Sequence, residues 1–214
     1  MKTVLITGAS GFIGRALCRE LERSGYSLIC LTRHKGQNQQ RYPQALWIED
    51  LDKITEEQSI DIIINLAGTP IAKRRWSKKV KAEIQSSRID FTETLFKFFS
   101  SRPAKPAVLI NGSAIGYYGP NEHDAMNEQS SPVDCFSHQL CAQWETAAMK
   151  FTQLGTHVCL LRLGIVLDRD GGALQSMLPA FRMGLGGPLG NGKQWMSWIH
   201  RQDVVRLIHF CIDN

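Results

Sequence analysis

Short apolar runs alternate along the chain with longer segments in which apolar residues recur every three or four positions. The runs are rich in Val, Ile and Leu, a pattern typical of strands buried on both faces of a parallel sheet. They occupy residues 4–6, 27–31, 45–51, 62–68, 107–111 and 157–167. Helical spacing predicts helices over 15–23, over 76–105, in a segment ending at residue 145, and from 203 onward. The alternation predicts an α/β fold with a doubly wound parallel sheet.

Three glycines follow the first strand at intervals of three residues: Gly8, Gly11 and Gly14. A strand, glycine turn and helix direct free backbone N–H groups and the positive end of a helix dipole at one point, which suits a pyrophosphate. We expect Gly8 to allow the tight turn, Gly11 to let phosphate approach the backbone, and Gly14 to let the helix pack closely. A turn without a ligand also uses glycines, but the flanking strand and helix favour nucleotide binding. The expected site comprises Gly8, Ala9, Ser10, Gly11, Phe12, Ile13 and Gly14.

The second strand leads into Thr32 and Arg33. In NAD-binding folds an acidic residue about 20 residues beyond the glycines holds the ribose 2′-hydroxyl. Arg33 follows Gly14 by 19 residues, and no carboxylate is near it in the sequence. A guanidinium there pairs with a 2′-phosphate through charge-assisted hydrogen bonds. A solvent-facing loop arginine is the plain alternative, but the position favours NADP over NAD.

Two further strand ends are expected to line the same ligand. Asp50 and Leu51 follow the third strand, and we expect them beside the adenine, with Asp50 accepting a hydrogen bond from its amino group. The fourth strand ends in Leu66, Ala67 and Gly68. Small residues at the carboxyl end of a strand leave room for a ligand in the sheet crevice.

The composition narrows the class of protein. A chain of 214 residues, 43% hydrophobic and 21% charged, suffices for one α/β domain with a small appendage. The first strand begins directly after Met1, and no run approaches the ~20 apolar residues of a membrane span. The six cysteines lack the spacing of a metal site. We therefore expect a cytoplasmic protein with reduced thiols, no metal and no membrane contact.

The net charge of +5 includes a basic cluster over residues 73–81. A nucleic-acid patch is one explanation, but no nucleic-acid-binding motif accompanies it. A solvated helix face near an anionic ligand is favoured instead, so we expect no nucleic-acid partner.

Several motifs together resemble a known family. The segment 7–14 and Asn65-Leu66-Ala67-Gly68 are similar to the corresponding motifs of extended short-chain dehydrogenases/reductases. Further segments resemble the nucleoside-diphosphate-sugar epimerase-like branch of that group. These segments are residues 70–71, 74–76, 87–88, 113–119, 187–190 and 194–200. The resemblance covers essentially the whole chain. It implies a Rossmann-like fold, an NADP cofactor and a substrate lobe built mainly by the C-terminal part.

The resemblance also implies cofactor contacts that spacing alone does not single out. By position they would be the turn 8–14, Thr32, Arg33, Leu66, Ala67, Glu83, Arg88 and Val166. Glu83 and Arg88 have a plain alternative, because charged residues on a helix surface are usually just solvated.

The fifth strand delivers Ser113, which in active members of this family hydrogen-bonds the reacting carbonyl or hydroxyl beside a Tyr-x-x-x-Lys pair. That pair is missing: the expected tyrosine falls at or near Ser137 and the expected lysine at Cys141. A serine is too weak an acid to replace a phenol, and a cysteine carries no positive charge to tune one. Tyr117 and Tyr118, beside Ser113, are the alternative phenols, although tyrosines next to glycine often simply pack.

We expect residues 1–165 to form the NADP-binding domain and residues 166–214 a partial substrate lobe with a returning helix. The glycine-rich segment 184–193 is either a substrate lid or a surface connection. His200 is expected to be a structural hydrogen-bonding residue. The family's members continue for several tens of residues beyond the last helix, so we expect the lobe to be truncated.

Two classes of function remain. The first is an NADP-dependent oxidoreductase or epimerase acting on an unidentified small molecule, which Ser113 and the adjacent tyrosines favour. The second is a non-catalytic protein that senses NADP(H), which the loss of the tyrosine and lysine favours. The sequence leaves the substrate and the oligomeric state open.

Overall fold

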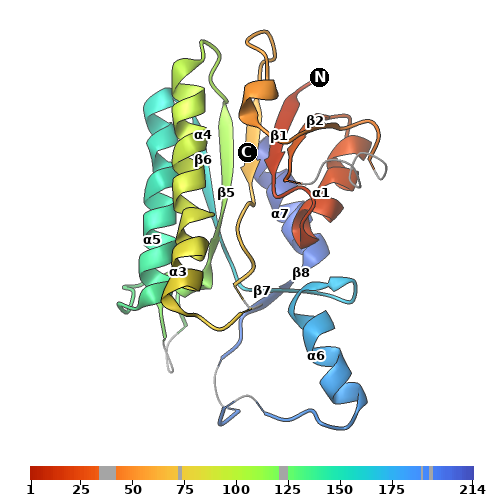
Figure 1. The fold of residues 1–214 in the computed structure, drawn as a ribbon, viewed down its shortest axis with the longest axis vertical. Coiled ribbons are helices and arrows are strands. Elements are labelled where there is room, and N and C mark those ends of the chain that lie inside the picture. Colours follow the sequence, from red (N-terminus) through yellow and green to blue (C-terminus); the bar gives the residue numbers. More distant parts are fainter. Residues whose placement is uncertain (34–41, 72–73, 121–124, 189, 193–194) are drawn as a thin grey trace.

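The computed structural model describes residues 1–33, 42–71, 74–120, 125–188, 190–192 and 195–214. Within these residues, six parallel strands form one sheet in the order β3-β2-β1-β4-β5-β6 (Figure 1). The strands are β1 (Thr3–Thr7), β2 (Ser27–Leu31), β3 (Leu46–Ile48), β4 (Ile62–Asn65), β5 (Val108–Ala114) and β6 (His157–Leu163). The predicted α/β fold with a parallel, Rossmann-like sheet is confirmed. The chain order of the strands reverses between β1 and β4, as in doubly wound folds.

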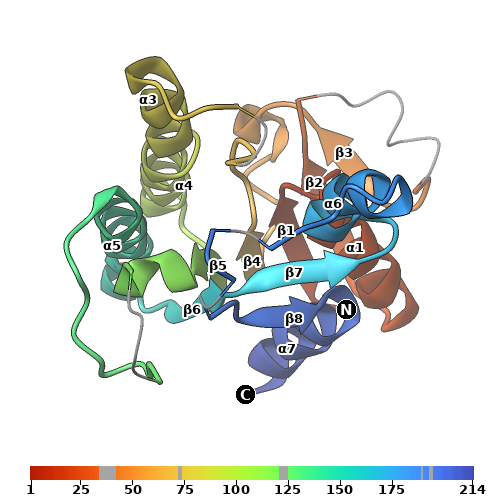
Figure 2. The same ribbon diagram turned by 90° about the horizontal axis from the view of Figure 1, so that it is seen from below.

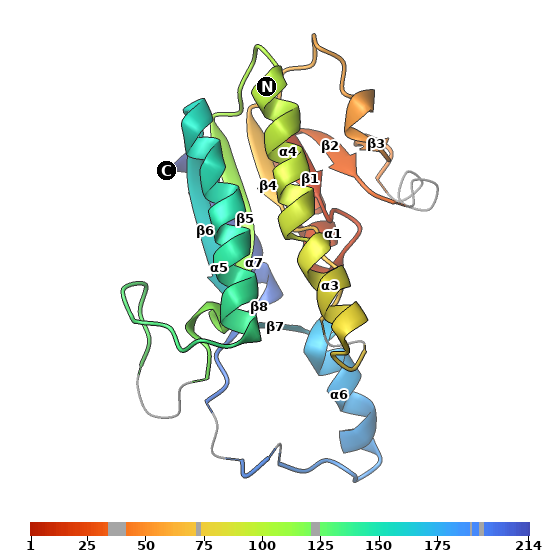
Figure 3. The same ribbon diagram turned by 60° about the vertical axis from the view of Figure 1, so that its left-hand side comes forward.

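Helices cover both faces of this sheet. Figure 3 shows one face covered by α3 (Lys78–Ser86), α4 (Ile89–Ser101) and α5 (Phe136–Met149). The other face carries α1 (Phe12–Arg23) and α7 (Arg201–Asp213). Successive residues of β1 point to opposite faces: Val4 and Ile6 pack with α1 and α7, whereas Leu5 packs with α4. The strands are continuous apolar runs because both faces of the sheet are buried.

In the described part of the chain, three short 3₁₀ helices connect these elements: η1 (Leu51–Lys53), η2 (Ile115–Tyr118) and η3 (Lys150–Leu154). The predicted helix over 76–105 is two helices, because the chain bends at Ser87 and Arg88 between α3 and α4. Gly25, which follows α1, is in the left-handed region, with a φ of 80°.

The predicted run 157–167 also divides into two strands. It breaks at Gly164, after which β7 (Ile165–Asp168) leaves the main sheet and pairs with β8 (Trp198–His200). A Cβ at Gly164 would lie 2.6 Å from the carbonyl oxygen of Ser197, so only glycine permits this close approach. Periodicity could not reveal the break, because both strands are apolar.

The strands β7 and β8, with α6 (Gly172–Arg182), lie beyond the carboxyl edge of the main sheet (Figure 2). The following α7 returns to the sheet, where Val204, Val205 and Ile208 are fully buried. His200 caps α7, because its Nδ1 accepts a hydrogen bond from the backbone N–H of Gln202 at 3.2 Å. The glycine-rich connection between α6 and β8 is exposed where it is described; residues 189, 193 and 194 lie outside the described part.

No helix within the described ranges is long and apolar enough to cross a lipid bilayer.

The tight turn after β1 generates a stability prediction. Gly8 and Gly25 both have positive φ, 71° and 80°, but a Cβ at Gly8 would lie 2.6 Å from the backbone oxygen of Leu66, whereas nothing lies within 4 Å at Gly25. We expect Gly25→Ala to lower the free energy of unfolding by about 1–2 kcal/mol, the cost of left-handed backbone. Gly8→Ala should cost about 1–3 kcal/mol more, because it also overpacks the strand ends. Urea unfolding that gave equal losses would contradict this account of the turn.

Candidate functional site

The residues expected to form the site gather at the carboxyl edge of the sheet. The glycine turn follows β1, Leu66 to Gly68 follow β4, and Ser113 lies near the end of β5. This edge faces the bottom of Figure 1, toward β7, β8 and α6. Ligands of open α/β sheets bind at this edge, where the strand order reverses.

The three glycines of the turn have separate roles. The carbonyl oxygen of Gly8 closes the turn by accepting a hydrogen bond from the Gly11 N–H at 2.9 Å. A Cβ at Gly14 would lie 2.3 Å from that same Gly8 oxygen, so α1 can approach the turn only through glycine. At Gly11, φ is −75° and an added Cβ would meet only the Gly8 oxygen, at 3.0 Å. The backbone therefore requires glycine less strictly at Gly11 than at Gly8 or Gly14, although the contact at 3.0 Å is tighter than ordinary packing.

The other turn residues pack against protein. Ala9 is fully buried and Ile13 packs on the core beneath α1. The ring of Phe12 lies against Gly171 and Gly172, where an added Cβ would come within 2.7 and 2.8 Å of ring carbons. Phe12 therefore connects the turn to the segment between β7 and α6.

A buried polar network holds the ends of β1, β4 and β5 in place. The hydroxyl of Thr7 donates to Asn65 Oδ1 at 2.6 Å and accepts from the backbone N–H of Ala67 at 3.2 Å. The Asn65 amide donates to Thr92 Oγ1 at 2.9 Å and to Asn111 Oδ1 at 2.7 Å. This network fixes the backbone of 66–68. Sequence reasoning missed Thr7 as a functional residue, although polar residues closing apolar strands were the available signal.

On the β2 side, Thr32 and Arg33 lie next to the turn. Thr32 is nearly buried, and its hydroxyl donates to the Ser10 hydroxyl at 3.4 Å. Arg33 is exposed. Asp50 caps η1, with Oδ1 accepting from the Asp52 N–H at 3.1 Å, while the side chain of Leu51 is buried in the core under β2 and β3. An adenine beside this segment would therefore meet Asp50 and the backbone rather than the Leu51 side chain.

Glu83 and Arg88 have different surroundings. Glu83 on α3 forms an ion pair with Arg74. The guanidinium of Arg88 lies over the end of β4: a Cβ at Gly68 would come within 2.8 Å of Arg88 Cζ, and Nη1 donates to the Thr69 carbonyl at 3.1 Å. Burial against Trp144 lowers the pKa of Arg88. The structure thus brings Arg88, but not Glu83, against the strand end at Gly68.

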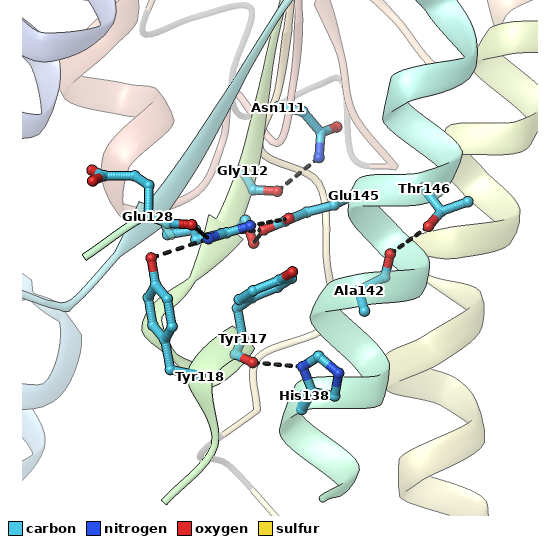
Figure 4. A network of polar contacts seen from close by, with 11 residues as sticks. Asn111, Gly112, Tyr117, Tyr118, Glu128, His138, Ala142, Glu145 and Thr146 are labelled. Carbon is cyan, nitrogen blue, oxygen red and sulfur yellow. Dashed lines mark hydrogen bonds and ion pairs between the residues drawn. The ribbon is translucent and has the colours of Figure 1, made fainter. Parts of the chain in front are cut away.

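Ser113 belongs to a cluster of charged and aromatic side chains, of which Figure 4 labels Tyr117, Tyr118 and Glu145. Its hydroxyl donates to Glu145 Oε1 at 2.6 Å. Arg162 binds both oxygens of Glu145, with Nε 2.9 Å from Oε1 and Nη2 2.8 Å from Oε2. Arg162 Nη1 also donates to the Tyr118 hydroxyl at 3.0 Å, and Arg162 Cζ lies 3.4 Å from the ring centre of Tyr117. The ion pair with Glu145 raises the pKa of Arg162.

Glu145 and Arg162 were not predicted as site residues. Arg162 is a charged residue within the apolar strand β6, and that was the available signal, because a charge is buried only with a partner. Glu145 in α5 has polar neighbours, Gln143 and Thr146, so the pattern around it offered no such signal.

Ser137 and Cys141, where the tyrosine and lysine of active family members are expected, face the Ser113 loop. A Cβ at Gly116 would lie 3.2 Å from Ser137 Cβ and 3.7 Å from Cys141 Sγ. Burial raises the pKa of Cys141, so its thiol is protonated at neutral pH. Val166, the last predicted contact, is half-buried in β7 and packs on the core shared with β1.

Comparison with known proteins identifies this arrangement. The model of the NAD dependent epimerase/dehydratase family matches residues 4–214. An epimerase family protein SDR39U1 homolog from the chloroplast of Arabidopsis thaliana is 39% identical over 219 residues, covering 99% of this chain and 62% of the relative. An epimerase family protein of Staphylococcus aureus is 40% identical over 217 residues, covering 100% of this chain and 72% of the relative. The chain therefore spans 62% of the length of the first relative and 72% of the second.

Solved structures agree with these relatives. Human epimerase family protein SDR39U1, solved with NADPH, superimposes with a TM-score of 0.82 at 32% identity, covering 97% of this chain and 68% of that one. A nucleoside-diphosphate sugar epimerase from Corynebacterium glutamicum gives a TM-score of 0.80 at 28% identity, covering 99% and 43%. The chain accordingly belongs to the NAD dependent epimerase/dehydratase family.

Proposed function

We propose that this protein binds NADP(H) and serves oxidoreductase or epimerase chemistry on an unidentified small molecule. One observation carries the proposal: the turn 8–14 needs glycine for its own backbone at Gly8 and Gly14, but least at Gly11. Gly11 directly precedes α1, and a pyrophosphate approaches a helix N-terminus at such a position. The human relative solved with NADPH supports the same cofactor here.

In this proposal the dinucleotide lies along the carboxyl edge of the sheet. Arg33 binds the 2′-phosphate, with Thr32 beside it, and Asp50 and Leu51 line the adenine. The turn 8–14 binds the pyrophosphate. The residues on the nicotinamide side are Leu66, Ala67, Gly68, Arg88 and Val166. Glu83 contributes to this side indirectly, through its ion pair with Arg74. Residues 1–165 form the cofactor domain, and 166–214 contribute a partial substrate lobe together with the returning α7.

The chemistry at Ser113 differs from that of a tyrosine and lysine pair. Bound NADP(H) supplies or accepts a hydride, so the protein must handle a proton at the reacting oxygen. Tyr118 is the phenol best placed for this, because its hydroxyl accepts from Arg162 and keeps its own hydrogen for donation. Tyr117 instead presents its ring to Arg162.

A non-catalytic role in sensing NADP(H) is the second candidate. It is favoured by the environment of Cys141, whose protonated thiol offers no positive charge at the expected position of the lysine.

Cofactor preference depends on Arg33. We expect NADPH to bind roughly tenfold or more tightly than NADH, because one charge-assisted contact with the 2′-phosphate contributes about 1.5–3 kcal/mol. Titration calorimetry of the Arg33→Ala variant should show NADPH affinity falling to that of NADH. Arg23→Ala, at the opposite end of α1, is the matched control and should keep the preference. Unchanged discrimination in Arg33→Ala would refute the assignment.

The glycine turn is tested by Gly11→Val. At Gly11 φ is −75° and ψ is −179°, so the backbone angles allow a branched residue, but its Cβ would lie 3.0 Å from the Gly8 oxygen, and the turn must shift by a few tenths of an ångström. We expect a folded protein, checked by circular dichroism and thermal unfolding, that has lost NADPH binding because the side chain fills the pyrophosphate site. Normal affinity in this variant would place the phosphates elsewhere.

Catalysis should be weak with ordinary substrates. We expect at best very slow turnover of secondary alcohols or UDP-glucose with NADP⁺, since Ser137 and Cys141 cannot supply the usual 10²–10⁴-fold of acid–base catalysis. Any residual turnover should fall by about 10²-fold in Tyr118→Phe and little in Tyr117→Phe, with NADPH affinity retained in both. Absorbance of NADPH at several substrate concentrations measures this. Brisk turnover independent of both tyrosines and Ser113 would show that the active site lies elsewhere.

A further inference from the structure

The hydrogen of the Ser113 hydroxyl is already used inside the protein, because it is donated to Glu145 Oε1 at 2.6 Å. We propose that Glu145 and Arg162 fix Ser113 as a hydrogen-bond acceptor, so that this site takes a ligand with a hydroxyl group in preference to one with a carbonyl group. The proposal rests on the proposed function, since it places the reacting end of the substrate at Ser113.

Glu145 can only accept hydrogen bonds in this arrangement. Its side chain is 8% exposed, and Arg162 binds both of its oxygens in the two-pronged geometry that guanidinium and carboxylate share. Oε1, the oxygen that faces Ser113, already accepts a hydrogen bond from Arg162 Nε, so it acts as an acceptor toward Ser113 as well. The hydroxyl of Ser113 must therefore be the donor in the contact between them.

Arg162 is itself held in position from three sides. It is the register partner of Ser113 on the adjacent strands β5 and β6, so the two side chains are neighbours on one face of the sheet. The Tyr118 hydroxyl accepts from Nη1, and the ring of Tyr117 stacks at 3.4 Å. Tyr117 is held in turn by His138, whose Nδ1 lies 2.6 Å from the Tyr117 carbonyl oxygen. The guanidinium thus cannot leave Glu145 without breaking a packed cluster.

The hydrogen-bonding groups of Ser113 that are left for a ligand determine which ligand binds. A serine hydroxyl has one hydrogen and two lone pairs. Because its hydrogen is donated to Glu145, the lone pairs are left for a ligand that donates, such as an alcohol. A carbonyl oxygen has no hydrogen to donate. If a ketone binds beside Ser113, its oxygen and the Ser113 oxygen are two buried acceptors with no hydrogen between them.

Two probes of matched shape, cyclohexanol and cyclohexanone, test this preference by NMR titration of the full chain loaded with NADP⁺. We expect cyclohexanol to bind roughly three- to tenfold more tightly, the effect of one hydrogen bond gained instead of lost. In Glu145→Gln the side-chain amide can donate to Ser113, which frees the serine hydrogen for the ligand. The preference should then disappear or reverse, and in Ser113→Ala it should disappear.

Glu93→Gln is the matched control, because Glu93 also accepts from a cation, Lys150 at 2.6 Å, but on the outer surface of α4 and α5. It should keep the preference for the alcohol. A wild-type preference for the ketone, or an alcohol preference that survives in both Glu145→Gln and Ser113→Ala, would overturn the inference. If the Glu145→Gln variant does not fold, the test rests on whether Ser113→Ala loses the preference for cyclohexanol.

Neutron diffraction from deuterium-exchanged crystals gives an answer even if neither probe binds. Deuterium density between Ser113 Oγ and Glu145 Oε1 is expected, and density directed away from Glu145 would overturn the inference. The affinity for NADPH, measured on the same wild-type preparation, separates the two proposals. Loss of NADPH binding counts against the proposed function, whereas NADPH binding without the expected orientation of Ser113 counts against this inference alone.

Discussion

The amide of Asn65 ties together the carboxyl ends of three neighbouring strands. It accepts from Thr7 of β1 and donates to Asn111 of β5 and to Thr92 of α4, all without exposure to water. An unpaired polar group at this depth would cost about 1–3 kcal/mol, so the partners hold one another in a single arrangement. The turn after β1 and the backbone of 66–68 both start from this point. Trp144 joins the network through Thr92, and Glu145 is the next residue of α5.

The ion pair of Glu145 and Arg162 is a second buried polar interaction. It lies on the β6 side of β5, whereas Asn65 lies on the β4 side. Removing both charges from water is costly, and such a pair seldom contributes net stability over apolar packing. The ion pair instead sets the direction of a hydrogen bond, because the Ser113 hydroxyl donates to Glu145. The two tyrosines of η2 enclose the guanidinium, so the same cluster that orients Ser113 also positions the Tyr118 phenol.

The glycine turn 8–14 also contacts the C-terminal segment. Phe12 packs on Gly171 and Gly172, and the guanidinium of Arg201 lies 4.9 Å from its ring centre. Arg201 forms an ion pair with Asp168 at the end of β7, at 2.9 Å. Residues far apart in the chain therefore meet at Phe12, the first helical residue after the glycine turn. A ligand that moves the turn would also act on β7 and α6 through this contact.

The sequence predicted the parallel sheet, which the structure confirms, and the glycine turn after the first strand, because both depend on local spacing and on strand ends that must share one edge. The roles of Ser113, Ser137 and Cys141 stay predictions. Only the tertiary structure decided that Gly164 divides one apolar run between two sheets, and that Glu145 and Arg162 meet at Ser113. Those residues are distant in sequence, with Ser113 and Glu145 32 positions apart. Their partnership arises from strand register and helix packing, which no local pattern encodes.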